Sequence, residues 1–260
     1  YLWQEISNHR SSIARLVNNI ESNYKYWIIK KECYKVVKIF KIKQPKNYKL
    51  LDIGCGKGER LKFFKDLGFS VLGLEVSDTV DYAREHFNLE IIKKDIYQAD
   101  FEDNSFDIVT LFNVLEHIHN PNKLLKEIYR ILKDNGFLVI QIPNTDSLQF
   151  KIFKKRWITF DIPRDLFYFN IKQLKYLLER QRFNLIKISF NDSFFHPSIC
   201  MASLFTNFDP QLIWLDERKN KKDNFLKRLF WPLGVCIILP LLILEVIFKK
   251  SGMVTLYIKK

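Results

Sequence analysis

The stretch LLDIGCGKGERL, residues 50–61, decides the fold. It begins as a buried strand that ends in Asp52, passes through Gly54, Gly56 and Gly58, and then takes on a helical pattern. Glycine lets a backbone turn tightly and approach a ligand where a Cβ atom would clash. A strand, a glycine-rich turn and a helix in this order predict a ligand-binding loop at the end of a strand.

The glycine spacing argues against a dinucleotide-binding loop. That fingerprint requires GxGxxG, whereas the third glycine, Gly58, comes one residue early here and Glu59 stands in its place. A carboxylate at this position suits a diphosphate poorly, because both groups are negatively charged. The loop is therefore expected to hold a different kind of ligand.

Outward from this loop, short apolar runs alternate with amphipathic stretches. The predicted strands are residues 50–53, 70–76, 90–95, 106–112, 136–143, 183–190 and 253–260. The helical patterns between them cover 60–67, 79–87, 122–133 and 171–181, with Asn135 and Gly136 marking a turn after the third. This βαβ rhythm is typical of a parallel sheet with helices on both faces. The sequence predicts an α/β fold with a doubly wound sheet of seven strands.

The loop has GxGxG spacing, and VLEHI at 114–118 is followed by Asn120 and Pro121. In these motifs the chain resembles the class I, Rossmann-like S-adenosylmethionine-dependent methyltransferases, from about Leu50 to Phe190 and again in its last strand. The resemblance implies an enzyme that binds S-adenosyl-L-methionine. It assigns to the methionine part of this cofactor the loop residues Asp52, Gly54, Gly56 and Gly58.

Further cofactor contacts are implied at the ends of the next predicted strands. Glu75 follows the loop by about 20 residues, where a carboxylate can accept hydrogen bonds from both ribose hydroxyls. By resemblance, Asp95 and Ile96 flank the adenine. Phe112 and Asn113 approach the methionine moiety.

Two histidines lie where the resemblance places the methyl acceptor. His117 and His119 are the candidate bases, because an imidazole accepts a proton near neutral pH. A hydroxyl or carbon acceptor benefits from a base, whereas an amine needs little help. For His119 a solvated loop or helix-cap position is the alternative.

The segment WITFDIPRDLFYF, residues 157–169, interrupts the regular pattern before the last helix and strands. It resembles a stretch W-x-x-x-D-x-P-R-H-x-x-x-F that is found in many relatives. Asp165 stands here where a histidine is frequent, so no base role is carried over to it. We expect Asp165 to orient an acceptor hydroxyl or amine, or else the aromatic residues around it to pack as a lid over the core.

The chain divides into five predicted segments. They are an N-terminal helical segment at 1–48, a methyltransferase core at 49–191, an insertion at 192–228, an apolar helix or hairpin at 229–248 and the final core strand at 249–260. The apolar segment is long enough for a bilayer span. A span would carry the last strand across the membrane, away from the sheet. We therefore expect an interfacial helix with flanking Lys and Arg on anionic headgroups, with a buried core or dimer helix as the alternative.

The composition bears on partners and location. A net charge of +13 and a pI near 9.4 favour an anionic partner, either a membrane surface or nucleic acid. Much of the charge flanks the apolar segment, which favours the membrane over nucleic acid. Four scattered cysteines indicate neither disulfides nor a zinc site, so no metal is expected. We predict a cytoplasmic protein on the inner face of the cell membrane.

The predicted function is methyl transfer to an O, N or C acceptor. The favoured acceptors are membrane-associated: a lipid, a quinone precursor or a lipid-linked saccharide. A nucleic-acid-modifying enzyme and a non-catalytic membrane-bound scaffold are the alternatives. The intact glycine loop and Glu75 argue against the scaffold, because a degenerate copy has no physical reason to keep a ribose carboxylate.

Overall fold

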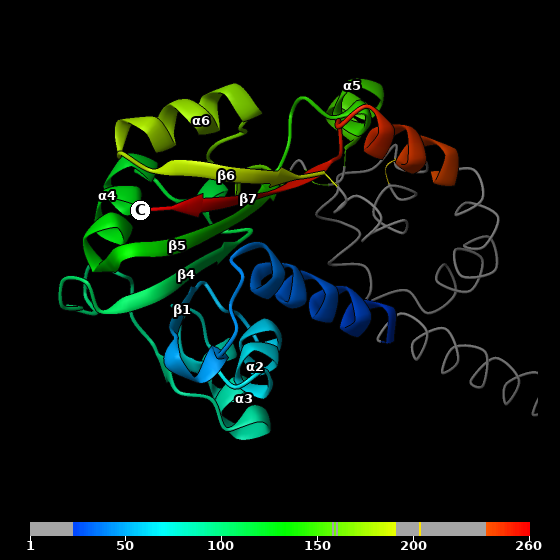
Figure 1. Cartoon of the computed structure of the whole chain (residues 1–260). Coiled ribbons are helices and arrows are strands. Elements are labelled where there is room, and N and C mark those ends of the chain that lie inside the picture. Colours follow the sequence, from blue (N-terminus) through cyan, green and yellow to red (C-terminus); the bar gives the residue numbers. More distant parts are fainter. Residues whose placement is uncertain (1–22, 158, 160, 191–202, 204–237) are drawn as a thin grey trace, which may run out of the picture.

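A computed structural model describes residues 23–157, 159, 161–190, 203 and 238–260, and these build a twisted sheet of seven strands (Figure 1). The strand order is β3-β2-β1-β4-β5-β7-β6. Strands β3 to β5 are parallel, whereas β7 runs antiparallel between β5 and β6. The bounds are β1 Lys49–Ile53, β2 Ser70–Leu74, β3 Ile91–Ile92, β4 Phe106–Phe112, β5 Leu132–Pro143, β6 Asn184–Ser189 and β7 Met253–Lys259. The predicted fold is confirmed.

Helices cover both faces of the sheet (Figure 1). They are α2 Glu59–Asp66, α3 Thr79–Phe87, α4 Pro121–Ile131, α5 Leu148–Phe153, α6 Ile171–Arg180, two further helices over 23–39 and 238–247, and the short turns η1 Pro45–Asn47, η2 Leu115–His117 and η3 Lys154–Arg156. Leu51 packs with α4 and α6, whereas its neighbour Leu50 packs with α2, α3 and the helix over 23–39. Successive strand residues point to opposite faces, so this sheet has two cores.

The terminal segments are described only in part. The helix over 23–39 confirms helical structure before the core, and it buries Ile29, Cys33 and Val36 against the sheet. The start of this predicted segment, residues 1–22, lies outside the described residues, as do 191–202 and 204–237. These ranges include all of the predicted insertion at 192–228 except residue 203, and the first nine residues of the predicted apolar segment at 229–248. Among the residues that are described, no helix has the length and apolar character needed to cross a bilayer.

The junction between α4 and β5 differs from the prediction. Helix α4 ends at Ile131, and β5 begins at once with Leu132. Pairing with β4 then jumps from Leu132 to Phe137, so the predicted turn is a bulge within the strand. Asn135 has a φ of +64° there, a left-handed conformation that asparagine tolerates better than most residues. The sequence correctly predicted an irregular backbone at Asn135 and Gly136. It was wrong to predict a turn there, because the chain stays within the sheet.

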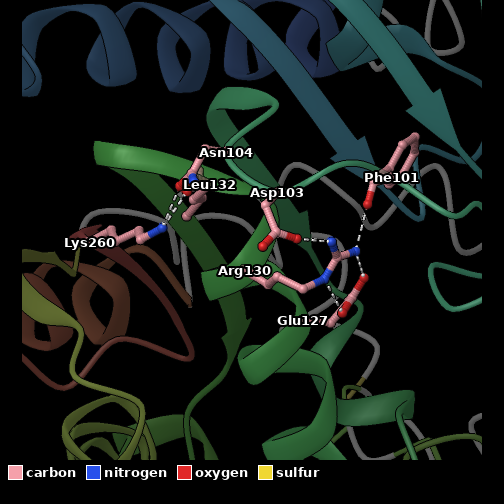
Figure 2. A network of polar contacts seen from close by, with 7 residues as sticks. All are labelled: Phe101, Asp103, Asn104, Glu127, Arg130, Leu132 and Lys260. Carbon is pink, nitrogen blue, oxygen red and sulfur yellow. Dashed lines mark hydrogen bonds and ion pairs between the residues drawn. The ribbon is translucent and has the colours of Figure 1, made fainter.

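Paired charges close the edge of the sheet where the parallel strands begin (Figure 2). Arg130, in the last turn of α4, donates to both carboxylate oxygens of Glu127, at 2.6 and 3.0 Å, and also to Asp103. Lys260, just after β7, donates to the carbonyl of Leu132 at 2.6 Å. Figure 2 shows Asp103 and Glu127 turned toward Arg130, and Lys260 reaching Asn104 and Leu132 in a second cluster. We call this side the closed edge. The parallel strands end at the opposite side, the carboxyl edge.

Candidate active site

The glycine loop after β1 lies at the carboxyl edge and is anchored to β2. The N–H groups of Gly54 and Cys55 both donate to the carbonyl of Leu74, at 2.7 and 3.2 Å. A Cβ on Gly54 would lie 2.5 Å from a Val114 methyl carbon, so only glycine fits there. Gly54 therefore packs directly against Val114, in the segment after β4.

Gly56 differs from the other two glycines of the loop. A Cβ on Gly58 would lie 2.6 Å from Leu89, so Gly58 is packed against the interior like Gly54. A Cβ on Gly56 would meet no atom within 4 Å, and its φ is +53°. The loop therefore presents bare backbone to open space at Gly56. The prediction that a ligand approaches the loop concerns this opening.

Glu75, at the end of β2, faces the same loop. Its Oε2 accepts from the N–H of Gly56 at 2.9 Å, and its Oε1 accepts from the N–H groups of Val76 and Ser77 at 2.8 and 2.9 Å. These three donors fix the carboxylate, which is partly exposed. The sequence predicted Glu75 at the site but not its hydrogen bond to Gly56, which couples the ends of β1 and β2.

Asp52 lies beneath the loop and is almost inaccessible, with 3% of its surface exposed. The Thr110 hydroxyl donates to its Oδ1 at 2.6 Å. Burial raises the pKa of Asp52 to about 6, against the opposing effects of this hydrogen bond and of Arg60. The sequence predicted Asp52 as a cofactor-binding residue. In the structure it is buried under the loop and supports it through the bond to Thr110.

Asp95 and Ile96 follow β3, which is shorter than the sequence predicted. The strand contains only Ile91 and Ile92, so Asp95 belongs to the turn after it rather than to its end. Its Oδ1 accepts from the N–H groups of Tyr97 and Gln98, at 2.8 and 2.9 Å. The carboxylate is exposed, while Ile96 is buried in the core. Because β3 runs parallel to β2, both residues lie at the carboxyl edge, like Glu75 after β2.

Phe112 and Asn113 end β4 and complete this part of the edge. Asn113 is exposed with a φ of +57°, and its N–H donates to the carbonyl of Gln141 at 2.9 Å. Phe112 is 8% exposed, and the Arg60 guanidinium carbon lies 4.5 Å from its ring centroid. Such a cation–π contact holds both groups in place.

A buried polar network behind the loop escaped the sequence prediction. Glu32, in the helix over 23–39, accepts from Arg60 Nε at 3.0 Å and from Gln141 Nε2 at 2.7 Å. It thereby links that helix to α2 and to the end of β5. One signal was available, since Glu32 lies on the apolar helix face that carries Ile29 and Val36. A carboxylate on such a face requires a buried partner.

The structure brings two of the candidate catalytic residues together. His117 Nδ1 lies 3.0 Å from Asp165 Oδ1 and 3.2 Å from the carbonyl oxygen of Arg164. Both neighbours are acceptors, so the proton of the neutral ring belongs on Nδ1 and Nε2 is left to accept one. The hydrogen bond to Asp165, whose side chain is 4% exposed, raises the pKa of His117 above its usual value.

The segment that carries Asp165 is fastened to η2 through Glu116. The N–H groups of Leu166 and Phe167 both donate to the Glu116 carbonyl, at 2.9 and 3.1 Å. The Glu116 side chain is buried, and its Oε2 has no hydrogen-bond partner among the described residues. Burial raises the pKa of this carboxyl to about 7. The segment therefore closes over η2 and holds Asp165 beside His117.

His119 is not part of this cluster. It is exposed on the turn before α4, next to Asn120, whose Oδ1 accepts from the N–H of Lys123 and caps the helix. Within the described part of the chain, His119 forms no hydrogen bond or ion pair with His117 or Asp165. This placement fits the alternative of a solvated residue near a helix cap.

Comparison with known proteins identifies this arrangement. Residues 24–188 match the family described as a methyltransferase domain. The chain belongs to this methyltransferase family. It is 39% identical to an uncharacterised protein of Methanocaldococcus jannaschii over 124 residues, which are 44% of this chain and 52% of that protein. It is 35% identical to the ubiquinone biosynthesis O-methyltransferase of Glaesserella parasuis over 107 residues, 37% of this chain and 45% of the relative.

Solved structures of methyltransferases share the fold. The phosphoethanolamine N-methyltransferase 2 of Haemonchus contortus, solved with S-adenosyl-L-methionine, matches with a TM-score of 0.59 and 20% identity, over 88% of this chain and 52% of that one. At this identity the likeness concerns the fold alone. The matched stretch spans about half the length of the two curated relatives.

The residues at the carboxyl edge fit S-adenosyl-L-methionine, the cofactor of this family. The backbone at Gly56 is open, so a ligand can approach it without meeting a side chain. Glu75 presents fixed carboxylate oxygens beside that opening, which suits ribose hydroxyls as donors. The negative charge of Glu75 also suits a ligand with a cationic sulfur.

Proposed function

We propose that this protein transfers a methyl group from S-adenosyl-L-methionine to a hydroxyl oxygen, with His117 as the general base. The distance of 3.0 Å between His117 Nδ1 and Asp165 Oδ1 carries the proposal. An amine acceptor does not require a base, whereas a hydroxyl becomes a better nucleophile when its proton is removed. A buried carboxylate that orients a histidine is therefore an argument for an oxygen acceptor.

The chain's own residues then have distinct roles. Bound S-adenosyl-L-methionine supplies an electrophilic methyl group and leaves as S-adenosylhomocysteine, with the electron pair of the broken carbon–sulfur bond on sulfur. His117 Nε2 takes the hydroxyl proton while the acceptor oxygen bonds to the methyl carbon. Asp165 holds the ring by Nδ1 and stabilises the imidazolium that forms. Gly56 and Glu75 hold the cofactor, with Asp95, Ile96, Phe112 and Asn113 at its two ends.

We further propose that the hydroxyl belongs to a membrane-associated molecule, such as a lipid, a quinone precursor or a lipid-linked saccharide. Two observations support this. The relative in Glaesserella parasuis is named for O-methylation in ubiquinone biosynthesis. The helix over 238–247 exposes large apolar side chains at the carboxyl edge, where an apolar acceptor would arrive.

Methyl transfer into a membrane lipid extract tests the reaction, with the methyl group of the cofactor radiolabelled. We expect wild-type protein to label a product as a methyl ether. His117→Ala should lower the rate by a factor of about 100 or more, the usual share of a general base. Calorimetry with S-adenosylhomocysteine should show unchanged affinity in this variant, because His117 does not hold the cofactor.

Two further variants separate base catalysis from a structural effect. Asp165→Asn should lower the rate and move the acid limb of the pH–rate profile to lower pH, because the carboxylate raises the pKa of His117 and the rate depends on the unprotonated ring. His119→Ala is the matched control and should keep the wild-type profile. A product methylated on nitrogen, or full activity in His117→Ala, would reject the oxygen-acceptor proposal.

A further inference from the structure

The helix over 238–247 is apolar on the side that faces away from the protein. Its exposed apolar residues, together with Phe248 just after it, are between 42% and 65% accessible: Leu239, Ile243, Leu244, Ile247 and Phe248. A surface helix normally places polar residues on its outer face. We call these five residues the docking face. The nine residues before the helix, 229–237, add no charged residue in the sequence.

The inner side of the same helix is firmly attached to the protein. Glu245 is fully buried, and its two oxygens accept from the backbone and side-chain nitrogens of Gln149, at 3.0 and 2.8 Å. Gln149 in turn accepts from the Trp157 indole N–H at 3.1 Å. Leu242 packs with Trp157 in the same small core. The helix is therefore held in one orientation, with its docking face outward.

Basic side chains lie on the chain segments next to the docking face. Lys151, Lys154, Lys155 and Arg156 are exposed on α5 and η3, the elements packed against this helix, and Lys249 and Lys250 follow its end. The two groups of lysines approach each other, since Lys250 lowers the pKa of Lys151. Ile152, between Lys151 and Lys154 in the sequence, is also exposed. An apolar face within a basic rim matches an anionic lipid surface, with acyl chains below and phosphates above.

The docking face lies at the same edge of the sheet as the candidate active site. Helix α5 follows the end of β5, and the first residue of β7, Met253, pairs with Pro143 at that end. Figure 1 shows α5 and the helix over 238–247 together beyond this end of the sheet. The Thr145 N–H donates to the carbonyl of Phe169 at 3.1 Å, which connects this region to the segment that holds Asp165. The docking face and the segment that carries Asp165 therefore belong to one connected region at this edge of the sheet.

We propose that the docking face and its basic rim bind the surface of an anionic lipid bilayer. The charge decides between this partner and a second copy of the chain, because two copies meeting face to face would bring their positive rims together. An anionic bilayer neutralises the rim and buries the apolar residues at once. The proposal rests on the contacts of this helix and does not depend on the proposed methyl transfer.

Sedimentation with liposomes tests the proposal on the full chain. We expect binding to vesicles of phosphatidylcholine with about a third phosphatidylglycerol, and binding at least 10-fold weaker to pure phosphatidylcholine or at high salt. Ile247→Ser with Phe248→Ser should weaken binding at least 10-fold. The matched control is Ile186→Ser with Tyr176→Ser, which removes one exposed isoleucine and one exposed aromatic residue elsewhere and should bind like wild type.

Charge reversal tests the rim separately. Lys154→Glu with Lys155→Glu should abolish the preference for anionic vesicles, whereas Lys172→Glu with Lys175→Glu, exposed on α6, should leave most of it. Equal loss in both pairs would mean that only net charge acts, and would overturn the proposal. Two other results would also overturn the proposal. One is a dimer in solution that Ile247→Ser with Phe248→Ser dissociates, and the other is binding to poly(U) RNA that anionic vesicles do not displace. Vesicle binding together with no methylated product in the membrane lipid extract would reject the proposed membrane-associated acceptor and leave the docking proposal standing.

Discussion

The two edges of the sheet manage their charged groups differently. At the closed edge, Arg130 is paired with Glu127 and Asp103, so side chains satisfy side chains (Figure 2). At the carboxyl edge, Glu75 and Asp95 are held by backbone N–H groups, and their oxygens keep lone pairs toward solvent. At the closed edge, the charged side chains pair with one another and stabilise the fold. The carboxyl edge is rigid through its backbone, so its side chains remain able to bind a ligand.

Gly56→Val is expected to give the largest difference between the edges. The backbone at position 56 has a φ of +53°, and a residue with a Cβ in this conformation loses about 1–2 kcal/mol of folding free energy. The new side chain also projects into the open space beside Glu75. We expect no measurable binding of S-adenosylhomocysteine by calorimetry. Gly68→Val is the matched control, because Gly68 also has a positive φ, +96°, and an open Cβ position, but lies in the turn before β2 at the other edge.

Both glycine variants should lose similar stability in thermal unfolding, and only the first should lose binding. Equal affinity in the two variants would mean that the loop does not hold the cofactor. Equal loss of affinity would mean that destabilisation alone explains the effect.

Glu116→Gln tests how much the burial of an ionised carboxylate at the carboxyl edge lowers the free energy of unfolding. The pKa of Glu116 is about 7 in the folded protein, above the 4.5 of an exposed glutamate, so the folded state binds this proton more tightly than the unfolded chain does. The free energy of unfolding therefore falls as pH rises from about 4.5 to above 7, by on the order of 3 kcal/mol from this group. Denaturant unfolding at pH 4.5 and pH 8 should show this fall in wild-type protein.

In the variant, the fall should be smaller by about the same amount, because glutamine does not titrate. The sign is the informative part of this measurement. A wild-type protein that gains more stability than Glu116→Gln between pH 4.5 and pH 8 would contradict a carboxyl group whose pKa is raised by burial.

Arg130→Met should have the smallest effect and should act on stability alone. The Arg130 side chain is 36% exposed, so water screens its ion pairs and we expect a loss of only about 1 kcal/mol in denaturant unfolding. The affinity for S-adenosylhomocysteine should not change, because the closed edge is at the far ends of the strands. A weaker affinity would show that the two edges are coupled through the sheet.

The sequence predicted those features that short stretches encode. The strands, the open glycine at Gly56 and Glu75 at the end of β2 follow from local patterns, so they could be placed without a structure. His117 and Asp165 were predicted singly. Their contact depends on how the segment around Asp165 folds back over η2. Arg164, which directly precedes Asp165, is 47 positions after His117 in the sequence. No local pattern encodes such a distance.

Other features depend on partners that only the fold supplies. The bond between Glu32 and Arg60 joins a helix before the core to the helix after the glycine loop. Strand β3 is short because only Ile91 and Ile92 pair with β2, and the residues up to Asp95 remain outside the sheet. Hydrophobic pattern alone does not reveal where pairing stops.

The position of β7 determines when the sheet can be completed during synthesis. Strand β6 pairs with β7 and not with β5, and β7 lies between them. During synthesis, β5 and β6 therefore keep unpaired edges until residues 253–259 leave the ribosome. The helix over 238–247 emerges just before that moment. A nascent chain already resting on a bilayer by this helix would wait for its last strand away from other exposed edges, which lowers its risk of aggregation.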